Sequence, residues 1–106
     1  MIGRIWHGYT TLENADIYED LLKEEIFIGI LNRHIPGSEE FQLFRRDLGN
    51  EVEFVTIMWF DSIESVQTFA GEDYEVAVVS PNARAVLSRF DERSQHYEVK
   101  ERLKGI

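Results

Sequence analysis

The sequence predicts an α+β fold of the ferredoxin-like type, a βαββαβ sandwich with a four-stranded antiparallel sheet. Two segments, residues 2–9 and 51–60, are apolar on both faces when they are read with a period of two. Such strands are typical of the centre of a sheet. Between and after these segments the apolar residues recur with the period of amphipathic helices. The first and third strands of a ferredoxin-like sheet are central, which matches the two segments.

The first strand, residues 2–9, sends Trp6 and His7 to opposite faces because side chains alternate along a strand. A helix is predicted to begin near residue 12 or 13, after two threonines that can cap it. Acidic residues in its first turns suit the positive end of the helix dipole. We expect this helix to end between Phe27 and Leu31, before a turn that contains Pro and Gly.

Residues 39–47 alternate weakly between apolar and polar side chains, which predicts a less buried strand. The short connection Leu48-Gly49-Asn50 contains the glycine that a tight turn needs. These residues therefore predict an antiparallel hairpin between residues 39–47 and 51–60.

The second half of the chain carries two further helix starts. Asp61 or Ser62 caps one helix, and Gly71 ends it. Residues 74–79 either continue this helix or form a loop. Ser80 followed by Pro81 begins a further helical segment, with the serine as cap and the proline at the first helical position.

The last strand is predicted from residue 95 to about residue 102, with Tyr97 and Val99 facing inward. Residues 100–106 are interpreted as a polar C-terminal tail. The sequence shows no repeat or linker, so residues 1–106 are expected to form a single domain with its core in about residues 1–99.

Composition limits the function classes. The chain has 106 residues and a net charge of −9, which argues against binding to nucleic acid or to an anionic membrane. It has no cysteine, so disulfides, thiol nucleophiles and thiolate metal sites are excluded. It shows neither a signal-peptide pattern nor a stretch of about 20 apolar residues, and we expect a cytoplasmic protein.

The predicted element order leaves one sheet face without cover. The helices of a βαββαβ chain pack on one face of the sheet, whereas the central strands are apolar on both. An exposed apolar face of that size is uncommon in monomers. We therefore predict a homodimer in which the two sheets face one another.

Motifs that specify a reaction are absent from the sequence. It contains no GxGxxG, GxxxxGK[ST], HExxH or GxSxG pattern. The three histidines, His7, His34 and His96, lie far apart and lack the short spacing of metal ligands. The prediction is that the protein holds neither a metal nor a cofactor.

Individual side chains nevertheless suggest a pocket. His7 could orient a substrate or carry a proton, because the free pKa of histidine is near neutrality, or it could be a hydrogen-bonded core or interface residue. Tyr74 could donate a hydrogen bond to a ligand, or it could be structural. Trp59 and Phe60 point to opposite faces of their strand, and packing alone can explain both.

Several segments resemble the short members of the antibiotic biosynthesis monooxygenase family, which have the dimeric α/β-barrel fold. These segments are IWHG, EEIFIGI followed by IPG, FQLFRRDLG with EVEFVTIMWFDSIESVQTFAGEDYEVAVV, and LSRFDERSQHYEV. The likeness covers about residues 1–99. It implies a homodimer with facing sheets and, in each subunit, a small-molecule cavity between sheet and helices. Characterised relatives oxygenate polycyclic aromatic substrates with O₂ and no cofactor, or degrade haem.

The resemblance disfavours haem degradation. Haem-degrading members use an Asn, a Trp and a His at positions that correspond here to Trp6 or His7, to Phe60 and to the neighbourhood of Val78. Valine cannot ligate iron.

The function implied by the resemblance is cofactor-independent oxygenation of an aromatic or apolar small molecule. His7 and Tyr74 are then the candidate catalytic residues that act on a phenolic proton, and Trp6, Phe60 and Phe69 are candidate pocket residues. The alternative is a dimer that binds a small molecule without catalysis, or a stress-related dimer. A purely structural dimerisation module is the third reading.

Overall fold

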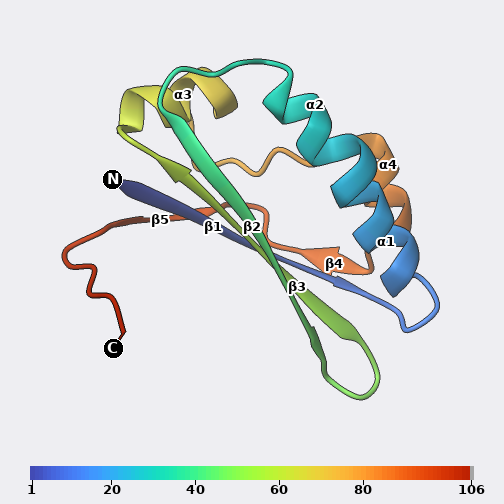
Figure 1. Ribbon diagram of the computed structural model, residues 1–106. Helices are drawn as coiled ribbons and strands as arrows, with labels where there is room; N and C mark the ends of the chain where they lie inside the picture. Colours follow the sequence, from blue (N-terminus) through green and yellow to red (C-terminus); the bar gives the residue numbers. More distant parts are fainter. Residues whose placement is uncertain (106) are drawn as a thin grey trace.

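The structure is a computed structural model that describes residues 1–105. An antiparallel sheet forms one layer, and the helices lie together on one of its faces (Figure 1). The strands are β1 (Ile2–Thr10), β2 (Ser38–Asp47), β3 (Val52–Phe60), β4 (Arg89–Phe90) and β5 (Gln95–Glu98), and the helical segments are α1 (Ala15–Leu21), η1 (Leu22–Ile26), α2 (Phe27–Leu31), α3 (Ile63–Ala70) and α4 (Pro81–Val86).

The strand order is β2-β3-β1-β4, with β5 also paired to β1, and every pairing is antiparallel. This order confirms the predicted α+β fold with β1 and β3 at the centre. The expected fourth strand, residues 95 to about 102, is present as the shorter β5, and β4 was not predicted. After β4 the chain leaves the edge of β1, because Ser94 N donates to Glu75 O at 2.6 Å and Arg93 forms a β-bridge with Val76.

The first helical segment begins later than predicted, at Ala15. The Thr11 hydroxyl accepts a hydrogen bond from Asn14 N at 3.2 Å, so residues 11–14 form a turn before the helix begins. The helix then runs without a break through α1, η1 and α2 to Leu31, as predicted for its end. Its middle part, η1, is a π-helix, a wider turn that often occurs at functional sites.

The predicted hairpin and caps are confirmed. Gly49 adopts φ +96° in the turn between β2 and β3, a conformation that favours glycine. Ser62 caps α3 by accepting from Ser65 N, and Ser80 caps α4 by accepting from Ala83 N. Residues 74–79 form a loop between these two helices.

Strand β3 connects two apolar clusters beneath the helices. Its first half contributes Val52 and Phe54 to one cluster, and its second half contributes Met58 and Phe60 to the other. The remaining buried members are Trp6, Ala15, Tyr18, Leu22 and Ala83 in the first cluster, and Ile2, Ile35, Val66 and Phe69 in the second.

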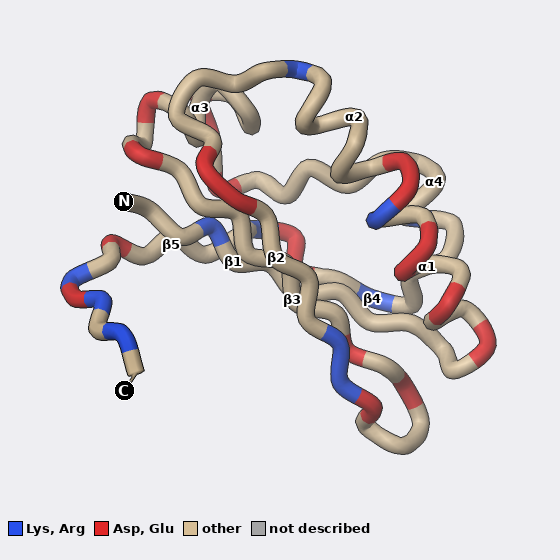
Figure 2. Tube along the Cα trace, viewed as in Figure 1, with Lys and Arg blue, Asp and Glu red and all other residues tan. Residues whose placement is uncertain are grey.

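The other face of the sheet has no cover within residues 1–105. Ile5, Val55, Ile57 and Trp59 lie there half-buried, because the alternation of β1 and β3 sends them away from the helices. Tyr97 of β5 also lies on this open face and is 59 % exposed, so the prediction that it faces inward is wrong. Its strand is an edge strand, and its partner residue Gly3 belongs to the open side of β1. Figure 2 shows that charged residues concentrate in the helices, the loops and the ends of strands.

Candidate functional site

A small cavity of about 60 Å³ lies between the sheet and the helical layer. Its walls come from the helix-facing side of β1 and β3, from α1, η1 and α2, from α3, and from the 78–80 loop with the start of α4. Most of the lining is apolar. The polar side chains in the wall are Arg4, Tyr18, Thr56, Ser80 and Ser94, and the apolar ones are Trp6, Leu22, Ile26, Phe27, Ile30, Met58, Phe69, Val78, Val79 and Ala83.

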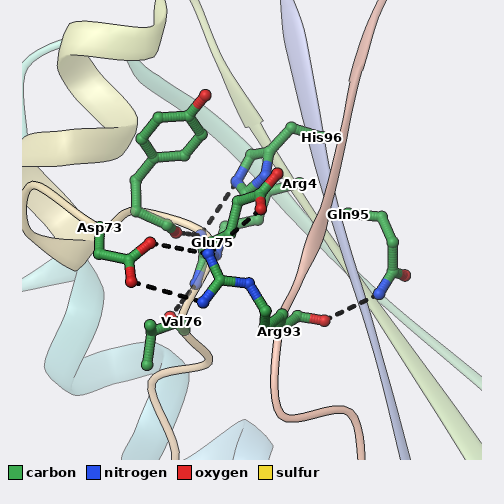
Figure 3. Close-up of polar contacts among 8 residues, drawn as sticks. Arg4, Asp73, Glu75, Val76, Arg93, Gln95 and His96 are labelled. Atoms are coloured by element: carbon green, nitrogen blue, oxygen red, sulfur yellow. Dashed lines mark hydrogen bonds and ion pairs between the residues drawn. The ribbon is translucent and has the colours of Figure 1, made fainter.

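Arg4 is the charged group of this wall, and it is only 3 % exposed. Its Nη1 donates to the carbonyl oxygen of Tyr74, and its Nη2 donates to that of Val76 at 3.2 Å (Figure 3). The guanidinium carbon lies 5.4 Å from the centroid of the Phe69 ring. Burial lowers the pKa of Arg4 to about 10, so the group remains charged at neutral pH.

The side chain of Arg4 also contacts the imidazole ring of His96 on β5. His96 Nε2 lies 3.0 Å from Arg4 Nη1 (Figure 3). An arginine can only donate, so Nε2 accepts and the proton of the neutral ring resides on Nδ1. Burial, followed by the charge of Arg4, lowers the pKa of His96 and favours this neutral form. His96 Nδ1 is buried and has no hydrogen-bond partner within residues 1–105.

Tyr18 on α1 also lines the cavity. Its ring packs edge-to-face against Phe54, with centroids 5.0 Å apart and planes at 78°. Burial raises the pKa of Tyr18, so its hydroxyl stays protonated. Among the bonds within residues 1–105, none involves this hydroxyl, which leaves it free to bind a ligand.

Two of the predicted pocket residues line the cavity, and one does not. Trp6 and Phe69 are part of its wall. Phe60 is fully buried behind Phe69, with ring centroids 6.0 Å apart, and belongs to the core. Trp6 Nε1 donates to Asp91 O at 2.9 Å, so its polar atom is already bound by the protein.

His7 lies on the open face of the sheet, opposite the cavity. Its Nδ1 is 2.7 Å from Asp91 Oδ2, and its backbone N–H donates to the same oxygen at 3.0 Å. Beside it, Phe44 and Val55 line a shallow hollow of the open face. The sheet therefore separates His7 from a ligand between sheet and helices, and a catalytic role for His7 stays a prediction.

Tyr74 lies beside the cavity and is not part of its wall. Its ring packs edge-to-face against His96, with centroids 5.0 Å apart and planes at 85°. Its clear link to the site is its backbone carbonyl, which accepts from Arg4. A catalytic role for the Tyr74 hydroxyl also remains a prediction.

Sequence reasoning missed Arg4 and Tyr18 as site residues. The signal for Arg4 was present, because alternation places it on the same face of a central strand as Ile2 and Trp6. A charged residue at such a position is unusual enough to mark a site. Tyr18 gave no separate signal, since its position on the apolar stripe of α1 is also that of a core residue.

Other kinds of site find no support in the part of the chain that the structure describes. No group of three or more His, Asp or Glu side chains is arranged to hold a metal ion in residues 1–105. None of the described helices is long and apolar enough to cross a membrane.

Similarity to known proteins is evident at the level of structure. No protein-family model matches the sequence, and a search of curated proteins gave no significant match. A crystal structure from Bacillus cereus, provisionally assigned as an antibiotic biosynthesis monooxygenase, is similar with a TM-score of 0.68 and 14 % identity, over 98 % of this chain and 97 % of that one. A second structure named antibiotic biosynthesis monooxygenase has a TM-score of 0.64 and 19 % identity, over 95 % of this chain and all of that one (100 %).

The haem-degrading protein MhuD from Mycobacterium tuberculosis, solved with two haems in its active site, has a similar structure as well. Its TM-score is 0.60 and its identity 19 %, over 98 % of this chain and 100 % of MhuD. The predicted likeness to antibiotic biosynthesis monooxygenases is thus confirmed for the fold. Since monooxygenases and a haem-degrading protein share this fold, the fold alone does not select the chemistry.

Proposed function

We propose that this protein binds an apolar, aromatic small molecule in the cavity between its sheet and helices, and that it does so as a homodimer. The observation that carries the proposal is the composition of the cavity wall. It is apolar except for a few polar side chains, among them Arg4 and Tyr18, both of which carry hydrogen-bond donors. Small-molecule sites commonly combine an apolar lining with a few such groups.

A ligand of this kind requires the cavity to widen. A volume of about 60 Å³ is less than half of the roughly 150 Å³ of an engineered apolar cavity that binds benzene. Among the helical segments that cover the cavity, α2 is the one that we expect to move. It has no buried residue, and its Ile28 and Leu31 are 48 % and 55 % exposed. Weakly packed elements open at low cost in free energy. The two haems bound by MhuD support the idea that this fold can accommodate a large ligand.

The binding experiment uses the indole N–H signals of the two tryptophans in a ¹H–¹⁵N NMR spectrum. Trp6 lines the cavity, whereas Trp59 lies on the open face and donates to Gln42 at 2.8 Å. Titration with 1-naphthol should shift the Trp6 signal and leave that of Trp59 unchanged. Trp6→Phe and Trp59→Phe assign the two signals. A shift confined to Trp59, or no shift at all, would contradict binding in the cavity.

The homodimer is supported by the apolar open face, which includes Ile5, Val55, Ile57 and Trp59. An unpartnered patch of this kind is typical of an interaction surface. Light scattering after size-exclusion chromatography should give about twice 12.4 kDa. Ile57→Glu should give a monomer, and Ile28→Glu, at an exposed position of α2, should remain a dimer. Wild-type protein that elutes as a monomer at micromolar concentration would refute this part of the proposal.

A second candidate function is oxygenation of a bound phenol without a cofactor, favoured by the buried charge of Arg4 at the cavity wall. A cation beside the phenolic oxygen stabilises the phenolate, which is the form that reacts with O₂. The substrate supplies the electrons. One oxygen atom of O₂ becomes a quinone carbonyl, and the other leaves as water.

Oxygen uptake with a panel of polycyclic phenols tests this second candidate. Wild-type protein should accelerate uptake above the rate in buffer, and Arg4→Met should abolish the acceleration. His7→Ala and Tyr74→Phe examine the two predicted catalytic residues. Uptake that neither substitution alters would remove both roles, and wild-type protein without uptake would leave binding alone as the function.

A further inference from the structure

We infer that Arg4 makes this cavity a site for an anionic ligand, an aromatic acid whose carboxylate binds the edge of the guanidinium while its ring occupies the apolar part. The inference rests on the proposed function, because it takes the cavity as the ligand site. It adds the chemical class of the ligand.

The charge of Arg4 lacks a carboxylate partner. Arg45, Arg89 and Arg93 lie at the surface, and each forms an ion pair with an acidic side chain. Arg4 is far more buried, yet no Asp or Glu among residues 1–105 forms an ion pair with it. A buried charge is costly unless an opposite charge accompanies it. An anionic ligand would supply that charge.

The carboxylates of the loop that contacts Arg4 are already paired elsewhere. Asp73 and Glu75 alternate along the chain with Tyr74 and Val76, whose carbonyls bind Arg4, and both pair with Arg93, at 2.7 Å and 3.3 Å (Figure 3). Arg93 is exposed, so these two ion pairs lie at the surface. The loop offers Arg4 only its backbone oxygens.

The donor count of Arg4 leaves two N–H groups of the guanidinium unused. Its hydrogen bonds to Tyr74 O and His96 Nε2 use both hydrogens of Nη1, and the bond to Val76 O uses one hydrogen of Nη2. The hydrogen on Nε and the second hydrogen on Nη2 have no acceptor within residues 1–105. Nε and Nη2 are neighbouring nitrogens of the planar group, and a carboxylate can bind arginine through two parallel hydrogen bonds to such a pair.

His96, which contacts Arg4, also retains an unused donor. Its buried Nδ1–H has no partner within residues 1–105, and its other ring nitrogen is held by Arg4. Unpaired buried donors are rare in proteins, and each costs free energy. His96 is not part of the cavity wall, so its unused donor shows only that the polar cluster around Arg4 is not fully paired within residues 1–105.

The experiment compares two ligands of equal shape, 2-naphthoate and 2-naphthamide, by isothermal titration calorimetry at pH 7. The first is an anion and the second is neutral, so their affinity ratio measures the preference for negative charge. Wild-type protein should bind the acid about tenfold more tightly or better, since hydrogen bonds to a charged group are the stronger ones. Arg4→Met should remove this preference and retain binding of the amide.

Two further variants separate charge from structure. Arg33→Met is the matched control, because Arg33 also stacks on Phe69, at 5.3 Å, and donates to two backbone carbonyls, but it is exposed and lies outside the cavity wall. It should keep the full preference for the acid. Arg4→Lys keeps the charge without the two-pronged geometry and should reduce the preference without abolishing it.

The outcomes distinguish this inference from the proposed function. Equal affinity of wild-type protein for acid and amide would overturn the inference, show Arg4 to be only a structural link to the 74–76 loop, and leave the proposed function intact. Failure of both ligands to bind would refute both. If circular dichroism shows that Arg4→Met is unfolded, the wild-type ratio and that of Arg4→Lys decide the matter.

Discussion

Replacement of Gly8 by alanine tests how tightly the wall of the cavity is packed. Gly8 lies on the helix-facing side of β1, two residues after Trp6. A Cβ atom at this position would lie 2.5 Å from Trp6 Cη2, 2.8 Å from Trp6 Cζ3 and 3.1 Å from Leu87 Cδ2. The first two distances are far below van der Waals contact, so the indole must move.

Movement of the indole should destabilise the folded protein, and its surroundings in the structure indicate by how much. The indole is buried, and its N–H donates to Asp91 O at 2.9 Å. Gly8→Ala should therefore lower the free energy of unfolding by about 1–3 kcal/mol, the usual range for overpacking. For a domain of this size each kcal/mol corresponds to a decrease in Tm of roughly 4–8 °C.

Urea denaturation followed by circular dichroism measures the change. Gly29→Ala is the matched control, because a Cβ at Gly29 meets no atom within 4 Å and the residue lies inside α2. Alanine there should stabilise the protein by about 0.5–1 kcal/mol through helix propensity. The reasoning fails if Gly8→Ala is as stable as the wild type, or if both substitutions destabilise equally.

Three further predictions concern single side chains. Ser62→Ala should lower the free energy of unfolding by about 1 kcal/mol, because it removes the cap that accepts from Ser65 N, and urea denaturation measures it. Burial lowers the pKa of His96 below its ordinary value of 6.5. Between the lowered pKa and 6.5, the unfolded chain binds more protons than the folded protein does. The free energy of unfolding should therefore fall as the pH decreases through this window. Denaturation at about pH 7.5 and pH 5.5 should show a larger loss for the wild type than for His96→Gln, and equal losses would contradict the assignment. Tyr18→Phe should leave stability within about 0.5 kcal/mol, because its hydroxyl has no partner in residues 1–105, but should weaken binding of 1-naphthol in the NMR titration. A large loss of stability instead would reveal a structural hydrogen bond of this hydroxyl.

The sequence by itself determined the features that depend on neighbouring residues. The period of two identified β1 and β3 as central strands, since alternation is a property of the strand alone. Gly49, Ser62 and Ser80 marked a turn and two caps, because each acts on backbone groups within a few residues. The separate strand β4 was not predictable in this way, because the break between it and β5 depends on a distant contact, in which Ser94 N donates to the backbone oxygen of Glu75.

The tertiary structure decided which side chains share a cavity. Alternation separated Trp6 from His7 but could not tell which of the two faces the helices, since both faces of β1 are apolar. The contacts of Arg4 with Tyr74 and His96 join residues 70 and 92 positions apart, and no local pattern encodes such contacts. Only the folded sheet and its covering helices therefore establish that a buried cation, and not a histidine, lines this site.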